Sequence, residues 1–369
     1  MPRALDGDAG AATSMPQTAG AGGSGAPPER PRSLDEEPEP REPRERRSLA
    51  FPIAIAGALV VAVVLGLLLG GGGGGEEKQA AAPPSIVPEQ PVQSGSIALE
   101  VPKGWQEIAT PPEIPRLALT DAAAYAPGGR DGGKAVEFGM AKANDSTLLP
   151  PKFRDQLGLA DGQVPERTPV KLGPDDIQAY RYAGLQPQGF DRTVTIYAAP
   201  TSAGVATVAC LAPPEAAEGF GPECEGIADT LQISDAKKFP VGPNPAYAKT
   251  LNRTLNQLDR RVAAGREALG RDGATFRAQA RAAGNIQAAY AEAARQLKQA
   301  ETSPADVTIN DALVDALTAA KEAWKNAASA ASDKNKGGFQ RSGAAIRRTQ
   351  QQLAQTLAGL EAVGYTLDR

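Results

Sequence analysis

RTVTIYAAP (192–200) and GVATVACLA (204–212) are two apolar stretches separated by three residues, and they decide the fold of the middle of this 369-residue chain. In the first stretch, polar and apolar residues alternate over 193–197, which is the period of a β-strand whose two faces meet different surroundings. Such stretches, bounded by Gly, Pro and Asp, are typical of an antiparallel sheet. We therefore predict two strands of an antiparallel sheet that has one buried face.

Further stretches with the same character precede this pair along the chain. Gly189 lies in the short GFDR link before residue 192, where a glycine can adopt the left-handed backbone angles of a hairpin turn. PPKFRDQLG (150–158) favours a short helix, and residues 213–233 favour a terminal helix packed on the sheet. We predict an α+β domain over 96–235, an antiparallel sheet with packed helices. Its other expected strands are 96–101, 116–125, 134–141 and 176–184.

The chain contains two cysteines, and both fall in this domain. Cys210 ends the last expected strand, and Cys224 follows 14 residues later in the terminal helix. A strand followed by a returning helix can bring two such residues together, and an oxidising compartment would allow them to pair. The pair lacks the C-x-x-C spacing of a redox site. We predict a structural Cys210–Cys224 disulfide.

SIALEVPKGWQEI (96–108), with its strand, its Val101-Pro102 step, Gly104 and Trp105, resembles the first strand and following tryptophan of PsbP-like and Mog1-like domains. These include LpqN-type lipoproteins of the actinobacterial cell envelope, and the high Ala, Arg and Pro content is also typical of such bacteria. The resemblance covers about 95–233 and implies an antiparallel sheet flanked by helices, with a binding or scaffolding role. It assigns no catalytic residue. Independently of it, we expect Trp105 to be a core residue.

After a linker at 236–244, alanine-rich helical sequence replaces the strands. Asn244 and Pro245 suit the cap and first position of a helix. Large apolar residues then recur at helical spacing in four segments, and breaks fall at 268–274, 303–306 and 332–338. We predict an up-down-up-down four-helix bundle over 245–365. A helix that continued through 270–273 would give a three-helix coiled coil instead.

Four aromatic residues lie on the apolar faces of the last three helical segments. They are Phe276, Tyr290, Trp324 and Phe339. Such residues could line a ligand groove, but an aromatic stripe at helical spacing more often belongs to a core, and we expect core positions here.

Residues 49–69, LAFPIAIAGALVVAVVLGLLL, form an uncharged run of 21 residues, long enough to span a bilayer as a helix. It starts too far from residue 1 and is too long for a secretory signal. Arginines precede the run in REPRERR, and only Lys78 follows it closely, so the N-terminus is expected inside. We predict a disordered cytoplasmic tail (1–48), a transmembrane helix (49–70), a Gly/Pro-rich linker (71–95) and extracytoplasmic domains beyond residue 76.

Composition excludes several chemistries. Histidine is absent, which removes Ser-His-Asp and Cys-His catalysis and histidine-ligated zinc. Residues 76–244 carry 14 basic and 22 acidic groups, and 245–369 carry 18 and 12. The basic excess of the last segment has no interleaved aromatic pattern, so we expect a solvated face and no nucleic-acid binding. We expect no cofactor, no metal and no catalytic residue.

These observations favour a non-enzymatic, single-pass membrane protein of the bacterial envelope that binds or scaffolds a partner protein, a glycan or an apolar ligand. One alternative is a sensor whose cytoplasmic tail signals inward. Another is a cell-wall hydrolase that uses two carboxylates in a cleft. The acids available for that chemistry are Glu137, Asp175, Asp176 and Glu225.

Overall fold

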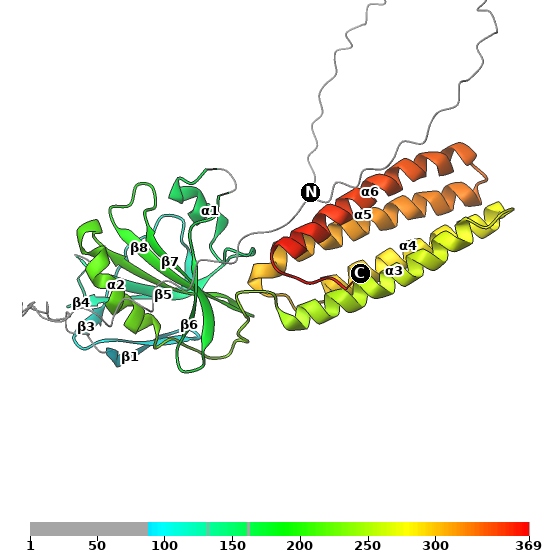
Figure 1. Cartoon of the computed structure of the whole chain (residues 1–369). Helices are drawn as coiled ribbons and strands as arrows, with labels where there is room; N and C mark the ends of the chain where they lie inside the picture. Colours follow the sequence, from blue (N-terminus) through cyan, green and yellow to red (C-terminus); the bar gives the residue numbers. More distant parts are fainter. Residues whose placement is uncertain (1–87, 131–132, 161–162, 369) are drawn as a thin grey trace, which may run out of the picture. The chain divides into compact units, whose positions relative to one another are not determined.

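The computed structural model describes residues 88–130, 133–160 and 163–368. The predicted tail, transmembrane helix and most of the linker lie outside these residues. Within the described part, no helix is both long enough and apolar enough to cross a membrane. The described chain comprises a sheet region (88–241) and a helical region (244–368), shown in Figure 1.

The main sheet has seven strands in the order β3-β4-β5-β9-β8-β7-β6, and all its neighbouring strands are antiparallel. Five of the six predicted strands are present in this sheet within a few residues of their expected positions, and β3 and β6 are additional. The sixth, expected at 96–101, forms β2 of a second sheet, so its expected place in the same sheet is wrong. Residue Gly189, in the β7–β8 connection, has a φ of 75° as the turn prediction required. The strands are β3 (Trp105–Glu107), β4 (Leu119–Pro127), β5 (Ala135–Ala141), β6 (Thr168–Leu172), β7 (Ile177–Leu185), β8 (Thr193–Thr201) and β9 (Gly204–Ala212).

A second, three-stranded sheet has the order β1-β2-β10. β2 (Ile97–Pro102) is the central strand, flanked by β1 (Pro88–Ser94) and the two-residue β10 (Gln232–Ile233). β1 falls inside the segment 71–95 that we expected to be a linker. Its prolines are compatible with a strand because β1 is at the sheet edge, where a missing N–H does not break a ladder.

Both faces of the main sheet are covered, so the prediction of a single buried face is wrong. Residues of β5 and nearly all of β8 and β9 are buried regardless of which face they occupy. One face packs against α2 (Pro214–Ala228) and the three-stranded sheet. The opposite face packs against α1 (Pro151–Arg154) and the loop residues Ile108 and Ile114. The alternating threonines of β8 were the reason to expect a solvated face. That expectation fails because sequence periodicity does not show which other elements cover a sheet.

The helical region consists of α3 (Pro245–Leu269), α4 (Phe276–Lys298), α5 (Val307–Ser332) and α6 (Lys336–Ala362). Asn244 caps α3 as predicted, with its side chain accepting a hydrogen bond from the Ala246 amide. α3 ends at Leu269 and α4 begins at Phe276, which excludes the continuous helix of the three-helix alternative. With α1 and α2, the described chain contains six α-helices beside its antiparallel sheets.

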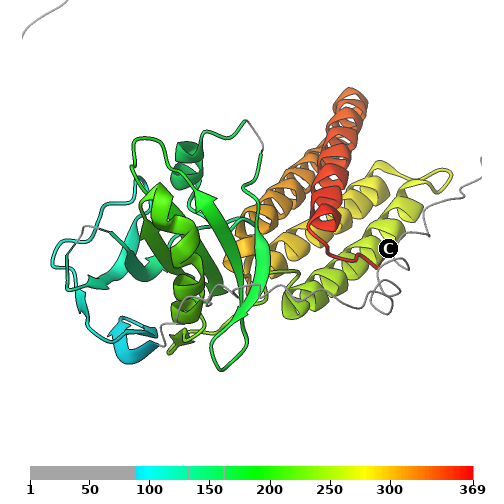
Figure 2. The same cartoon turned by 60° about the vertical axis from the view of Figure 1, so that its left-hand side comes forward.

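α4 and α5 have the most extensive contact of any helix pair in this array (Figures 1 and 2), and both helices bury many alanines. α3 packs on α4, and α6 packs on α5, whereas α3 and α6 do not close against each other along their lengths. We call the end where α3 meets α4 and α5 meets α6 the tip, and the opposite end the base. The buried alanines are Ala282, Ala283, Ala289, Ala293 and Ala294 of α4 and Ala316, Ala320, Ala323, Ala327, Ala330 and Ala331 of α5.

Candidate binding groove

A groove of about 570 Å³ opens at the tip of the helical region. Its size falls in the range of about 300–1,000 Å³ that is usual for small-molecule sites. The walls come from the starts of α4 and α6, which are separated by about 60 residues of chain. Phe276 and Phe339 supply its aromatic surface, and Lys336 its charged group. The other lining residues are Ala274, Thr275, Gln279 and Gln340.

Local sequence fixes the backbone of both walls. Thr275 caps α4 by accepting a hydrogen bond from the Ala278 amide at 3.2 Å. Asn335 caps α6 by accepting one from the Gly338 amide at 2.8 Å. Gly273, in the connection that leads into α4, has a φ of 69°, which a residue with a Cβ rarely adopts. The two phenylalanines therefore project from capped helix starts and not from irregular loops.

The structure divides the predicted aromatic stripe into two pairs. Tyr290 and Trp324 are core residues, with 4% and 6% of their surface exposed, as we expected. Phe276 and Phe339 are only half-buried and line the groove. Because α3 and α6 do not close at the tip, the same helical repeat that fills the core lower down leaves aromatic surface open there. The expectation of a core position is therefore wrong for Phe276, whereas Phe339 packs against the edge of the helical core.

Charge is distributed unevenly between the two halves of the helical region. If each helix is divided at its midpoint, the tip half comprises 258–287 and 320–349 and carries 13 basic and 5 acidic residues. The rest of 245–369 carries 5 basic and 7 acidic residues. The tip is therefore at +8 and the remainder at −2. Nearly all of the basic side chains at the tip are exposed to solvent, as expected, but the excess is concentrated at the end that holds the groove.

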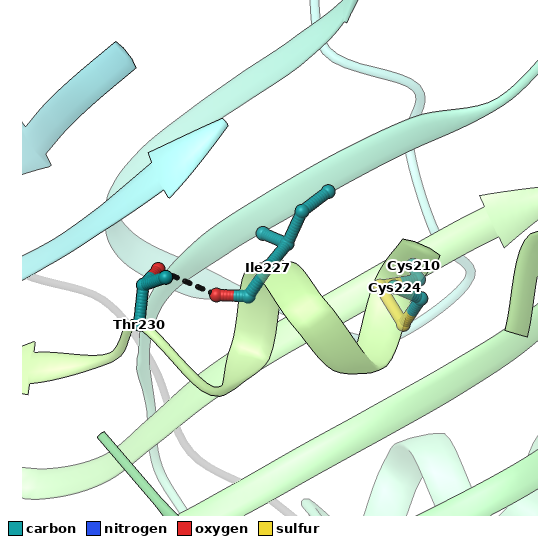
Figure 3. The surroundings of a disulfide bond; sticks show 4 residues. All are labelled: Cys210, Cys224, Ile227 and Thr230. Atoms are coloured by element: carbon teal, nitrogen blue, oxygen red, sulfur yellow. Dashed lines mark hydrogen bonds between the residues drawn. A yellow bond between two sulfur atoms is a disulfide. The ribbon is translucent and has the colours of Figure 1, made fainter. Parts of the chain in front are cut away.

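The predicted disulfide is present and joins β9 to α2, as Figure 3 shows. Cys210 and Cys224 are both buried, with Cα atoms 6.0 Å apart. One helical turn further on, the Thr230 hydroxyl donates to the Ile227 carbonyl at 2.7 Å and closes the end of α2. The space beside the disulfide measures about 10 Å³, roughly the room of one water molecule. The disulfide therefore belongs to a packed interface and not to an open site.

Trp105 is also a packing residue, as predicted. It is 4% exposed, and its ring stacks against Phe220 of α2 at a centroid distance of 6.2 Å. Trp105 therefore holds α2 to the sheet region by ring packing, and the disulfide holds α2 to β9 by a covalent bond.

The four acids considered for hydrolysis do not converge on a common cleft. Glu137 and Glu225 lie on opposite faces of the main sheet, because the neighbours of Glu137 in β5 pack beneath the helix that carries Glu225. Asp175 and Asp176 occupy the exposed β6–β7 turn. There Asp175 pairs with Lys238 at 2.5 Å, and Asp176 pairs with Lys171 at 3.7 Å.

Glu137 is the unusual member of this set. It is 7% exposed and lies opposite Ala124 and Ala209 in the adjoining strands. Its Oε2 atom is buried without a hydrogen-bond partner in the described structure. Burial among these small apolar residues raises the pKa of the carboxyl to about 7. Sequence alternation places Glu137 on the sheet face opposite to the face of Val136 and Phe138. Glu137 is a buried acid because other parts of the chain cover its face of the sheet as well.

A buried polar cluster occupies the base of the helical region. The Tyr247 hydroxyl donates to Asn310 Oδ1 at 2.9 Å, and the Asn244 amide donates to the Tyr365 hydroxyl at 3.0 Å. The two tyrosine rings meet edge to face at 5.5 Å. Asp306 is 4% exposed beside them, and burial raises the pKa of its carboxyl. The cluster binds the C-terminal segment to the start of α3, so its polar groups serve internal contacts.

Among the described residues, no group of three or more Cys, Asp or Glu side chains is arranged to hold a metal ion. No protein-family model, curated protein or solved structure matches this chain. The candidate site is therefore the tip groove, which is defined by its shape, its two phenylalanines and its basic surroundings.

Proposed function

We propose that the protein is a membrane-anchored, extracytoplasmic binding or scaffolding protein of the bacterial cell envelope, without enzymatic activity, and that the tip groove is its ligand site. One observation carries this proposal: a groove of about 570 Å³ at the tip of the helical region is lined by two half-exposed phenylalanines. A large apolar pocket with a few polar groups is the default binding site of an unassigned structure.

The groove favours binding over catalysis. Its charged lining group is Lys336, and its polar lining groups are two glutamines and a threonine. This set lacks a paired acid and base for proton transfer, while it offers donors around an apolar floor. Among the described residues, the acid with the most perturbed pKa is Glu137, which lies in the sheet region and does not line this groove.

The cellular placement rests on the sequence and on the disulfide. Residues 49–70 have the length and flanking charges of a single span with its N-terminus inside. A structural disulfide between Cys210 and Cys224 is typical of a compartment outside the cytoplasm. A PsbP-like or Mog1-like identity for the sheet region remains part of the proposal, based on residues 96–108.

Photo-crosslinking in intact cells tests this function with the full chain. A photoreactive amino acid in place of Gln279 places the reactive group in the groove. The same substitution at Lys298, exposed near the base of the same helix, is the matched control. We expect envelope lipid, glycan or protein adducts at position 279 that are several-fold more abundant than at 298. Equal yields at the two positions, or adducts with cytoplasmic proteins alone, would overturn the proposal.

A further inference from the structure

We propose that the tip of the helical region docks on an anionic lipid bilayer, with Phe276 and Phe339 against the apolar boundary and the surrounding cationic groups against the lipid headgroups. The inference rests on the proposed function, because it takes the groove as the binding surface and adds its occupant. It is carried by the coincidence of three features at the tip: the basic excess, the uncompensated helix starts and the exposed aromatic surface.

The basic excess has the sign and the arrangement that an anionic surface requires. The tip half of the helices is at +8. The basic side chains within two residues of the groove lining are Arg277, Arg281, Lys334, Lys336 and Arg341, and all of them are exposed. Each basic residue that approaches an anionic membrane adds to its electrostatic attraction. Because these side chains are distributed over both helical hairpins, they match an extended charged surface better than a single point charge.

The helix starts add to the same potential. α4 and α6 both begin at the groove, and neither has an acidic residue in its first turn. The aligned peptide dipoles of a helix place about half a positive charge at its N-terminus. An acidic first-turn residue would compensate that charge, so the tip presents two uncompensated N-termini beside its arginines and lysines.

The two phenylalanines of the groove are the reason why binding of small counter-ions does not account for the whole surface. Phe276 and Phe339 remain half-buried at positions where a soluble protein gains nothing by exposing aromatic surface. Aromatic residues surrounded by lysine and arginine are the usual composition of surfaces that lie in the bilayer interface. An acidic peptide would satisfy the same charges, but a bilayer is already within reach of this chain.

That reach follows from the chain lengths. The predicted span ends at residue 70, and β1 begins at Pro88. The 17 residues between them extend at most about 60 Å. The helices of the array have 23 to 27 residues and are therefore about 35–40 Å long. The tether attaches at β1 in the sheet region, and its length allows the folded chain to lie along the proposed anchoring membrane with the tip against the lipid.

Site-specific fluorescence on the full chain in lipid vesicles tests the docking. Both native cysteines form the disulfide, so a Gln340→Cys variant takes an environment-sensitive dye at the groove alone. The vesicles contain either phosphatidylcholine alone or equal parts of phosphatidylcholine and phosphatidylglycerol, with nitroxide-labelled lipid as quencher. We expect quenching several-fold stronger in the anionic vesicles, and lost at high salt because exposed charges are then screened. A dye at Lys298→Cys, at the base, should show no such dependence.

Two charge variants make the test specific. Neutralising Arg277, Lys336 and Arg341 to glutamine should reduce the docked fraction by roughly tenfold or more. The same loss of charge at Lys249, Arg253 and Lys298, exposed near the base, should leave docking unchanged. Both triple variants should retain the far-UV circular dichroism of the parent.

The possible failures separate this inference from the proposed function. If quenching is equal in neutral and anionic vesicles, or if the tip and base triple variants lose it equally, docking on anionic lipid is wrong. If an acidic amphipathic peptide shifts the dye while the vesicles do not, the occupant is a peptide and the lipid assignment fails. In each case a groove-specific crosslink at position 279 would leave the binding function standing, whereas loss of that crosslink would remove both.

Discussion

In the sheet region, large side chains and a disulfide fill the interior, whereas the helical region buries many alanines among its larger side chains. Phe138, Phe153 and Tyr182 are fully buried in the sheet region, and a disulfide ties its terminal helix to the sheet. The helical region buries its larger residues mainly below the tip and leaves Phe276 and Phe339 half-exposed there. The sheet region therefore uses its apolar surface for stability, whereas the helical region leaves part of its apolar surface available for binding.

The sharpest test compares two phenylalanines. Phe138→Ala opens a cavity in a fully buried site and should reduce the free energy of unfolding of the sheet region by about 3–5 kcal/mol. Phe339→Ala, at the half-exposed groove, should cost less than about 1 kcal/mol. The two tryptophans permit separate measurements: Trp105 reports the sheet region and Trp324 the helical region. In denaturant titrations, the fluorescence of each tryptophan is measured in a variant in which the other tryptophan is replaced by phenylalanine.

Similar losses for the two variants would contradict the comparison, because they would make Phe339 a core residue. A loss of vesicle docking by Phe339→Ala, with unfolding almost unchanged, would instead sharpen it.

The disulfide should matter to the sheet region and not to the helices. Changing both Cys210 and Cys224 to serine should cost the sheet region about 3 kcal/mol, the value for closing a loop of about this length. The measurement is Trp105 fluorescence in denaturant, with the parent under reducing conditions as a second route to the same state. An unchanged Trp105 midpoint, or an equal shift at Trp324, would contradict the assignment of the disulfide to the sheet region alone.

Glu137 makes the stability of the sheet region depend on pH. Its pKa is about 7 in the folded state and 4.5 in the unfolded state, so folding favours the protonated form. Stability is fully present below about pH 4.5, decreases as the pH rises through 7, and levels off after a loss of about 3 kcal/mol. Glu137→Gln should remove this decrease in urea titrations across that range. The exposed Glu218→Gln on α2 should retain it, and a parent protein with flat stability would refute the prediction.

Tyr365→Phe should cost less stability than Phe138→Ala, the loss of the disulfide or the ionisation of Glu137. It removes the hydroxyl that accepts a hydrogen bond from the buried backbone amide of Asn244 at the base of the helices. A buried donor left unpaired costs about 1–3 kcal/mol. Trp324 fluorescence measures the loss, and a shift of the Trp105 transition instead would assign the contact to the wrong region.

The strands could be predicted because alternation along 193–197 and in neighbouring stretches records at least one covered face. The cover on the second face could not, since it comes from α1 and from loop residues such as Ile108, distant in sequence. β1 was hidden by its prolines, which are typical of linkers as well as of edge strands. The disulfide followed from the strand-to-helix return that links Cys210 to Cys224.

The candidate groove was only partly accessible from the sequence. Helical spacing placed Phe276 and Phe339 on the same faces as Tyr290 and Trp324. A sequence repeat does not indicate at which residues two neighbouring helices stop contacting each other. Counting charges over the whole of 245–369 also hid the basic tip. Once helix bounds were known, dividing each helix at its midpoint would have revealed it, as would the missing acids in the first turns of α4 and α6.

The buried alanines of α4 and α5 have a consequence for the cost of binding. Alanine has no side-chain rotamers to lose, so ordering these positions costs backbone entropy alone. The helix backbones that carry the groove residues are ordered when the chain folds. A ligand then has to order only the lining side chains, and more of its interaction energy remains as affinity.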